Sequence, residues 1–265
     1  MRFLKRQSDL SNYAFLPIFP LKNPEGWREI DIHECGESLV PLSAVSPDQI
    51  VVDSWYYKEG YSNAMKECCV RETVAQQLCK ASEMLPMGWK IVIFDAWRSL
   101  ELQQQIFEKY KAKLKRKYPE FSKHKLNQEV QKYVSLPSSN SSSPSPHVSG
   151  GAVDLSLRDD SGKNLDMGTE FDTFYDESYT RYYESKLEQD GKLSRREQKW
   201  LENRRILFHA LTCVGFTNFP EEWWHFDYGN QFWARIKGKE AIYGITSFNE
   251  NRAICKRSLA HRKES

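Results

Sequence analysis

The chain has 265 residues, 40% hydrophobic and 28% charged, a composition typical of a globular protein with one large domain or two small ones. Its formal net charge of +2 gives no overall field that would favour nucleic acid or a membrane surface. No apolar run approaches the length of a membrane span, and Pro17 interrupts the apolar residues that follow the basic N-terminus, so no secretory signal is recognised. We therefore expect a cytoplasmic protein.

The six cysteines form no CxxC pair, which argues against a cysteine zinc site. Cys79 and Cys213 lie in apolar helical patterns and are predicted to be reduced core residues. A chain of this length does not need disulfides in order to fold, so we expect reduced thiols.

The N-terminal half predicts a mixture of helices and strands. Residues 1–50 show no strong period, and their prolines indicate extended segments and turns. The run 70–85 predicts a helix, because its apolar residues at 70, 74, 78 and 81 share one face. The β-branched run WKIVIFDAW (89–97) predicts a buried strand. Ser99 can then cap a helix that extends to about Tyr118.

The C-terminal half begins with a low-complexity Ser/Pro loop at 135–146, followed by a strand at 151–157. A charged helical stretch at 176–193 precedes the capping box SRRE (194–197), which predicts a helix to about Cys213. WWHFDYG (223–229) reads as a strand. Helices and strands are mixed without regular alternation, so the predicted fold class is α+β.

Asp154 lies in the middle of the strand that ends PSPHVSGGAVDLSL (144–157). Because side chains alternate along a strand, Val153 and its alternate neighbours should face the core, and Asp154 should face away from it between small residues. His147 precedes Asp154 by seven residues, and the glycines at 150 and 151 supply a bend that could bring the two together. Taken alone, this pair is typical of a structural hydrogen bond.

The second stretch, PEEWWHFDYG (220–229), places Glu222 three residues before His225, and His225 shares strand parity with Asp227. Two histidines, a carboxylate and a separate glutamate are the side chains that a catalytic zinc hydrolase needs. Three ligands leave a fourth position for water, whose pKa zinc lowers to about 7, and a carboxylate can take its proton. The helical HExxH motif is absent.

These residues resemble the D-alanyl-D-alanine dipeptidases of the vancomycin-resistance type. The family pattern SxHxxGxAxD is matched from Ser145 to Asp154, and ExxH is matched by Glu222 and His225. Asp95 and Arg98 match an Asp-x-x-Arg element, and DMGTEFD (166–172) is similar to a further family segment. The resemblance covers roughly residues 50–235. It implies an antiparallel sheet with flanking helices, the fold of the hedgehog and D-Ala-D-Ala metallopeptidase group.

The resemblance also implies roles for single residues. One zinc ion per chain would be bound by His147, Asp154 and His225, and Glu222 would be the general base. Arg98 would stabilise the oxyanion; without the resemblance, a surface ion pair with Asp95 is an equally good interpretation. The substrate ammonium group would be held by Ser145 and Asp172. A tyrosine lines the family's site, and both Tyr56 and Tyr57 are candidates.

The leading hypothesis is therefore zinc-dependent hydrolysis of the small dipeptide D-alanyl-D-alanine. The alternatives are a D,D-carboxypeptidase or endopeptidase acting on larger peptidoglycan peptides, and a zinc-binding module without catalysis. The chain departs from the family pattern in a longer N-terminal segment, in the Ser/Pro loop and in an expansion at 176–200. Because of these departures, the sequence does not determine how wide the entrance to the site is. The predicted organisation is an N-terminal extension packed on the core (1–50), the zinc D,D-dipeptidase domain (51–248) and a basic C-terminal tail (249–265). The sequence does not define an oligomeric state.

Overall fold

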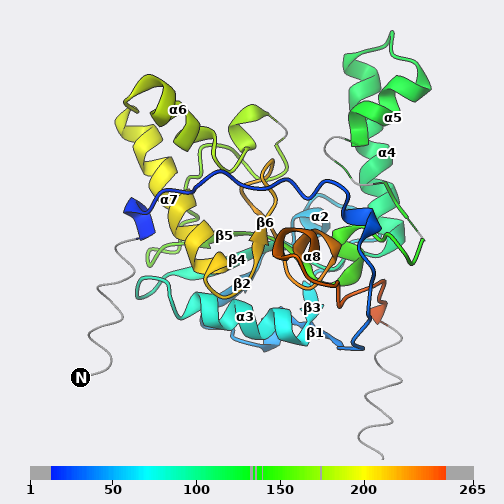
Figure 1. Cartoon of the computed structure of the whole chain (residues 1–265), viewed down its shortest axis with the longest axis horizontal. Coiled ribbons are helices and arrows are strands. Elements are labelled where there is room, and N and C mark those ends of the chain that lie inside the picture. Colours follow the sequence, from blue (N-terminus) through cyan, green and yellow to red (C-terminus); the bar gives the residue numbers. More distant parts are fainter. Residues whose placement is uncertain (1–12, 132–133, 135, 139, 174, 249–265) are drawn as a thin grey trace, which may run out of the picture.

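The computed structural model describes residues 13–248 apart from 132, 133, 135, 139 and 174. Its five-stranded sheet has the order β2 (Ile50–Val52), β4 (Lys90–Asp95), β5 (Ala152–Arg158), β7 (His225–Asp227) and β6 (Thr217–Asn218). β2 and β4 are parallel, and the other neighbours are antiparallel. A second sheet pairs β1 (Leu39–Pro41) with β3 (Cys69–Arg71). This mixed, mainly antiparallel arrangement with helices around it confirms the predicted fold class (Figure 1).

The helices follow the capping signals of the sequence closely. Ser99 accepts a hydrogen bond from Leu102 at the start of α4, and Ser194 and Glu197 form the predicted capping box of α7. The α-helices are α2 (Trp55–Lys58), α3 (Glu72–Ser82), α4 (Leu100–Lys117), α5 (Lys123–Gln131), α6 (Tyr182–Asp190), α7 (Arg195–Thr212) and α8 (Gln231–Lys237). Short 3₁₀ turns are η1 (Tyr13–Phe15), η2 (Trp27–Glu29), η3 (Leu42–Ala44), η4 (Pro146–Ser149) and η5 (Asp176–Ser178).

The main core lies between the five-stranded sheet and helices α3 and α7. Val153, Leu155 and Leu157 are fully buried in it, as the alternation along β5 predicts. Leu78 of α3 and Leu207 of α7 belong to the same cluster. A separate apolar cluster joins α2 to the α4–α5 hairpin, which extends away from the sheet in Figure 1.

Two predictions need correction. Residues 69–71 form strand β3, and the helix begins only at Glu72, because Val70 pairs with Val40 of β1 and this long-range ladder overrides the helical pattern. Cys213 is exposed at the end of α7 and is not a core residue, whereas Cys79 is partly buried and packs against the main core, as predicted. The cysteines that the structure describes are all free thiols, as expected, and Cys255 lies outside the described residues.

Residues 13–18 are held against helices α6 and α7 by hydrogen bonds to charged side chains. Arg205 forms two 2.7 Å hydrogen bonds with Glu184, and the amide of Ile18 donates to the same carboxylate at 2.8 Å. Arg181 donates to the carbonyl of Ile18 at 2.7 Å. From this attachment the chain crosses the front of the molecule towards α8, as the dark blue trace in Figure 1 shows.

The organisation into an extension, a domain and a tail stays a prediction. Within it, β1 and the start of β2 precede residue 51 and pair with later strands. The tail 249–265 lies outside the described residues. No helix in the described part of the chain is long and apolar enough to cross a membrane, and the cytoplasmic location also stays a prediction.

Candidate metal centre and active-site cavity

Three neighbouring strands present polar side chains in one row across the sheet. Asp154 of β5 is the register partner of both Asp95 of β4 and His225 of β7. Directly opposed residues in a sheet have Cβ atoms only about 4.5–5.5 Å apart, so pairing of the strands is sufficient to bring these side chains together. All three are at least 95% buried.

His147 reaches the same point from the loop before β5. It lies in η4, which ends at Gly150 with φ 73°, a conformation that favours glycine. Gly151 cannot carry a side chain either, because a Cβ there would lie 2.4 Å from the carbonyl oxygen of Tyr228. The two glycines therefore provide the bend that the sequence predicts.

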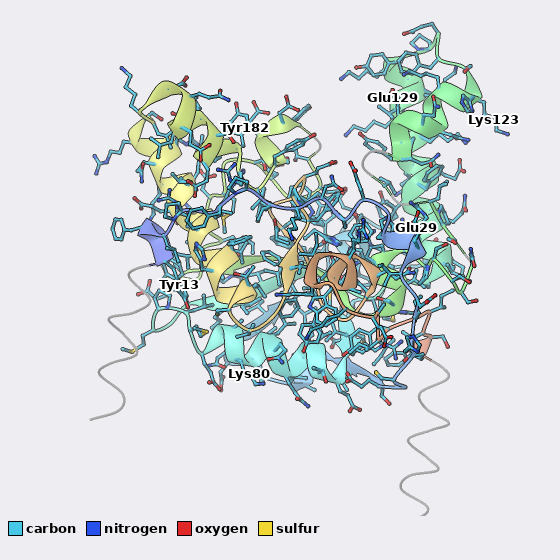
Figure 2. All side chains as sticks on the ribbon, viewed as in Figure 1. Tyr13, Glu29, Lys80, Lys123, Glu129 and Tyr182 are labelled. Carbon is cyan, nitrogen blue, oxygen red and sulfur yellow. The ribbon has the colours of Figure 1, made fainter. Side chains whose placement is uncertain are left out.

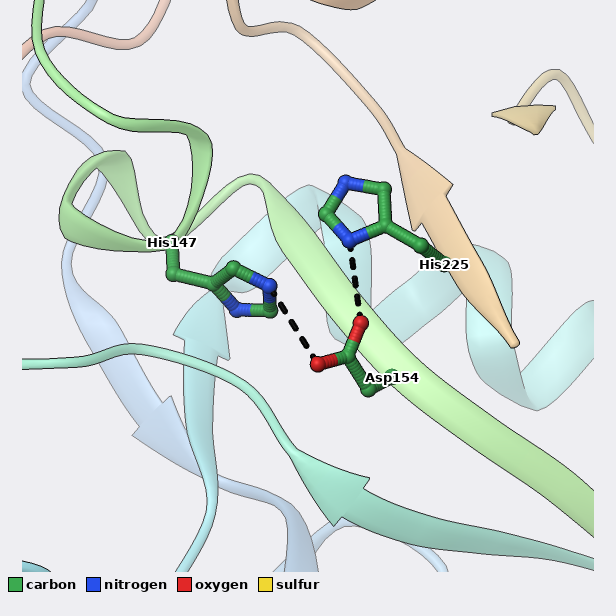
Figure 3. Close-up of side chains that lie close together, drawn as sticks. All are labelled: His147, Asp154 and His225. Atoms are coloured by element: carbon green, nitrogen blue, oxygen red, sulfur yellow. Dashed lines mark hydrogen bonds and ion pairs between the residues drawn. The ribbon is translucent and has the colours of Figure 1, made fainter. Parts of the chain in front are cut away.

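The donor atoms of His147, Asp154 and His225 lie within 4.8 Å of one another (Figure 3). His147 Nε2 is 3.4 Å from Asp154 Oδ2, and His225 Nδ1 is 2.9 Å from Asp154 Oδ1. Ligand atoms around a tetrahedral zinc, with bonds of about 2.0–2.1 Å, are roughly 3.3 Å apart. The cluster therefore fits a zinc ion with small adjustments of the side chains.

In each histidine ring, the nitrogen that points away from the cluster lies close to a hydrogen-bond acceptor. His147 Nδ1 lies 2.6 Å from the carbonyl oxygen of Ala96, and His225 Nε2 lies 3.2 Å from Asp227 Oδ1. Because a carbonyl and a carboxylate accept hydrogen bonds, these nitrogens can keep their protons while the inward nitrogens bind a metal. Asn230 donates to Asp227 at 2.6 Å and also caps α8. The sequence pattern predicts that Asp227 and His225 lie on the same face of their strand, but no role was predicted for Asp227.

Burial alone would raise the pKa of Asp154, but the two histidines reverse this effect. Charge and hydrogen bonding from His147, followed by His225, hold that pKa well below its usual range. Asp154 is therefore a carboxylate, the form in which an aspartate binds a metal.

Arg98 is buried beside the cluster, so it is not the surface residue of the alternative interpretation. It pairs with Asp95, and it also donates to Asp154 Oδ2 at 3.1 Å and to Gln103 at 3.1 Å. Its guanidinium carbon is 5.1 Å from the centre of the Tyr56 ring. These contacts fix the planar group at the wall of the cavity.

Glu222 lies in the turn before β7, with Oε2 3.8 Å from Nδ1 of His225. Burial raises its pKa to about 8, and the nearby carboxylates of Asp154 and Asp172 act in the same direction, whereas His225 and Arg98 lower it. A buried carboxyl group with a shifted pKa, next to a candidate metal site, is a candidate for proton transfer.

Asp172 is the one non-glycine residue with a positive φ, 60°, among the residues that the structure describes. Such a backbone costs about 1 kcal/mol or more and is typical of functional positions. The hydroxyl of Tyr56 donates to its carboxylate at 3.2 Å, and burial raises its pKa to about 7. Tyr56 is buried and lines the cavity, whereas Tyr57 is 48% exposed, which answers the question that the sequence left open.

The loop that carries Asp172 is held by a buried arginine that the sequence analysis did not identify. Arg204 of α7 donates to the carbonyl oxygens of Met167, Glu177 and Tyr179 at 2.7–2.8 Å. Arg204 is 1% exposed. Its three side-chain hydrogen bonds therefore hold the backbone of this loop.

Ser145 completes the wall of a cavity of about 600 Å³ that all the candidate residues line. Its hydroxyl is buried and has no hydrogen-bond partner among the described residues. A buried polar atom without a partner usually costs about 1–3 kcal/mol, so such a group next to a cavity indicates a position for a ligand. The cavity is also lined by residues 23–28, which belong to the predicted N-terminal extension.

Two histidines and a carboxylate beside a glutamate and an arginine in one cavity are the donor set of metal-dependent hydrolases. Comparison with known proteins agrees with this class. Residues 39–240 match the family described as D-ala-D-ala dipeptidase, and the chain therefore belongs to this peptidase family.

Two relatives extend the comparison. A D-alanyl-D-alanine dipeptidase of Synechocystis sp. is 30% identical over 219 residues, which cover 77% of this chain and 87% of the relative. A D-alanyl-D-alanine dipeptidase of Escherichia coli is 28% identical over 196 residues, which cover 71% of this chain and 83% of the relative.

Proposed function

We propose that the protein hydrolyses the dipeptide D-alanyl-D-alanine to two molecules of D-alanine, with one zinc ion per chain. The observation that carries the proposal is the buried cluster of His147, Asp154 and His225, within reach of Glu222 and Arg98 in a single cavity. Family membership supports peptidase chemistry, and the names of the two relatives support the choice of dipeptide.

In this proposal His147, Asp154 and His225 hold the zinc. When bound, zinc would polarise the scissile carbonyl and lower the pKa of a water to about 7. The proton of the attacking water passes to the carboxylate of Glu222, which then gives it to the leaving amine; a bound zinc ion nearby would favour the ionised form of Glu222 that this step needs. Arg98 faces the negative charge that develops on the carbonyl oxygen in the tetrahedral intermediate.

The substrate ammonium group is assigned to the unpartnered hydroxyl of Ser145 and the carboxylate of Asp172. Asp172 has a lone pair to offer because Tyr56 donates to only one of its oxygens. Free D-Ala-D-Ala carries an ammonium group at this end, whereas a residue within a longer peptide carries a neutral amide.

A second candidate function is cleavage of longer peptidoglycan peptides. The observation in its favour is the cavity volume of about 600 Å³, which is within the range of about 300–1000 Å³ that drug-sized ligands occupy. A zinc-binding module without catalysis is less well supported, because Glu222 and Arg98 both line the cavity.

One assay separates these functions. Zinc-loaded protein is incubated with D-Ala-D-Ala, with L-Ala-L-Ala and with a pentapeptide ending in D-Ala-D-Ala, and released alanine is measured. We expect rapid cleavage of the first substrate alone. Cleavage of the pentapeptide would support the second function, and no cleavage of any substrate would support the binding module.

We expect Asp227→Asn to weaken zinc binding by about 10–100-fold, the usual effect of losing a carboxylate that orients a metal-binding histidine. Asparagine can present its NH₂ group to His225 Nε2, which favours the wrong tautomer. The measurement is a competitive titration with a zinc-binding dye. Asp53→Asn is the control, since Asp53 is a partly buried carboxylate paired with Lys58 outside the cavity. A wild-type zinc affinity in Asp227→Asn would assign His225 a different orienting group.

The KM for D-Ala-D-Ala should rise as the pH falls through about 7, where Asp172 is half protonated. Burial raises this pKa, so the carboxylate is present above it and lost below it, and a protonated Asp172 no longer attracts an ammonium group. A bound divalent cation nearby would favour the carboxylate and move the onset to lower pH. KM is measured against pH for the wild type and for Asp172→Asn. The proposal fails if both proteins give the same profile.

A further inference from the structure

The cavity has one wall that lies outside the segment matched to the family. Residues 23–28 line it, whereas the family match begins at residue 39. The cavity is also lined by residues of α4, of α5 and of the segment after α5, among them Ile106, Gln131 and Val134. In Figure 2 the turn that carries Glu29 lies between the centre of the molecule and the α4–α5 hairpin. The N-terminal segment therefore shapes the mouth of the site.

This wall is fixed to the helix that follows the strand of His225. Gln231 of α8 donates to the carbonyl oxygen of Ile30 at 2.6 Å, and Arg235 donates to that of Glu25 at 2.8 Å. The ring of Trp27 is buried and packs edge-on against Phe232, with centroids 4.9 Å apart. Phe232 in turn lies 6.5 Å from the ring of His225. The wall is thus positioned relative to the candidate metal centre.

Arg28 is the charged group that this wall contributes. Its guanidinium carbon lies 4.2 Å from the centre of the Trp27 ring, a stacking contact that restricts a long side chain. The cavity lining that the structure describes contains two arginines, Arg28 and Arg98, and no lysine. Arg98 is engaged with Asp95 and Asp154, whereas Arg28 takes part in none of the described ion pairs.

The other charges of the lining are acidic: Glu25, Asp154, Asp172, Glu221 and Glu222. If the proposed function holds, zinc, Asp172 and Glu222 account for the scissile carbonyl, the ammonium group and the transferred proton. The carboxylate of the leaving residue is the one substrate charge without a partner. A carboxylate that enters an otherwise acidic cavity needs a fixed cation, and arginine is the side chain best suited to it.

We propose that Arg28 binds the free carboxylate of the leaving D-alanine and so selects substrates cleaved at a C-terminal residue. This inference rests on the proposed function. It assigns the site to dipeptides, or to longer peptides cut at their last bond, and it excludes efficient cleavage of bonds inside a peptide.

The test compares D-Ala-D-Ala with its C-terminal amide, which has the same size but lacks the carboxylate. For the acid, Arg28→Gln should raise KM on the order of tenfold, the loss expected for a partly exposed charge-assisted contact, with kcat nearly unchanged. For the amide, KM should be the same in the variant and the wild type. Arg28→Lys should fall between them with the acid, because an ammonium keeps the charge but not the planar fork.

Arg196→Gln is the matched control. Arg196 is also an exposed arginine stacked on a tryptophan, 4.9 Å from the ring of Trp200, but it does not line the cavity. Its substitution should leave both KM values unchanged. Equal increases of KM for the acid and the amide in Arg28→Gln would show that the residue only shapes the wall, and an unchanged KM for the acid would also overturn the proposal.

Failure of the proposed function gives a different result. In that case the zinc-loaded wild type cleaves neither substrate, and calorimetric titration of the same proteins with D-Ala-D-Ala and its amide replaces the kinetics. A tenfold weaker binding of the acid alone to Arg28→Gln would still support a carboxylate site at Arg28. Equal binding of the acid to the variant and the wild type would contradict it.

Discussion

Glu222→Gln is expected to bind zinc with wild-type stoichiometry and to lose about 10²–10⁴-fold in kcat for D-Ala-D-Ala. Glutamine preserves the size of the side chain, but it cannot accept the proton of the attacking water. Since Glu222 Oε2 lies 3.8 Å from His225 Nδ1, zinc content has to be measured together with kcat.

The adjacent residue provides the control for this variant. Glu221 also lines the cavity, is partly buried, and has its pKa raised by burial. It lies outside the described contacts of the metal cluster. Glu221→Gln should therefore keep most of the activity. A metal-replete Glu222→Gln variant with near wild-type kcat would assign the proton transfer to another group.

Arg98→Ala should lower kcat by about 10²–10³-fold, with a much smaller change in KM. Loss of one oxyanion donor costs about 2.7–4 kcal/mol of transition-state stabilisation in a comparable site. A fixed guanidinium acts most strongly where charge develops, and less on the neutral carbonyl of the bound substrate. Arg98→Lys should recover only part of the rate, since an ammonium on a flexible stem cannot keep the contacts with Asp95 and Gln103 together.

The ion pair of Arg98 with Asp95 means that the Arg98→Ala variant can lose stability as well as activity. In Arg98→Ala the buried carboxylate of Asp95 loses its partner, so the variant should be less stable. The double variant Arg98→Ala with Asp95→Asn removes that unpaired charge. We expect the double variant to regain melting temperature but not kcat. Recovery of both together would mean that Arg98 is only a structural partner of Asp95.

The parts of the fold that sequence predicted well depend on local chemistry. Ser99 and the box of Ser194 and Glu197 begin helices because their side chains satisfy amides within the next turn. The β-branched run of β4 and the alternation of β5 likewise carry their own signal. The residues of the candidate site were found from their spacing and family resemblance, and the paired strands bring them together.

The parts that sequence missed depend on partners far along the chain. Val70 fits a helical pattern, but its pairing with Val40 makes it a strand residue. Tyr56 could not be distinguished from Tyr57 until the loop of Asp172 was placed against it. Arg28 looks like an ordinary surface arginine, and only the attachment of its segment to α8 brings it to the cavity.

The row of Asp95, Asp154 and His225 has a consequence for how the protein matures. These residues come from three strands, and Asp154 and His225 are 71 positions apart in the chain. Contacts between such distant positions form only when most of the chain has folded, because closing long loops is entropically costly. In a partly folded chain His225 would therefore not yet lie beside Asp154, and two of the three proposed zinc ligands would be apart. If the proposed zinc site holds, the fraction of molecules with tightly bound zinc would then measure the fraction with a fully formed sheet. Molecules without zinc would include those in which β7 has not paired with β5.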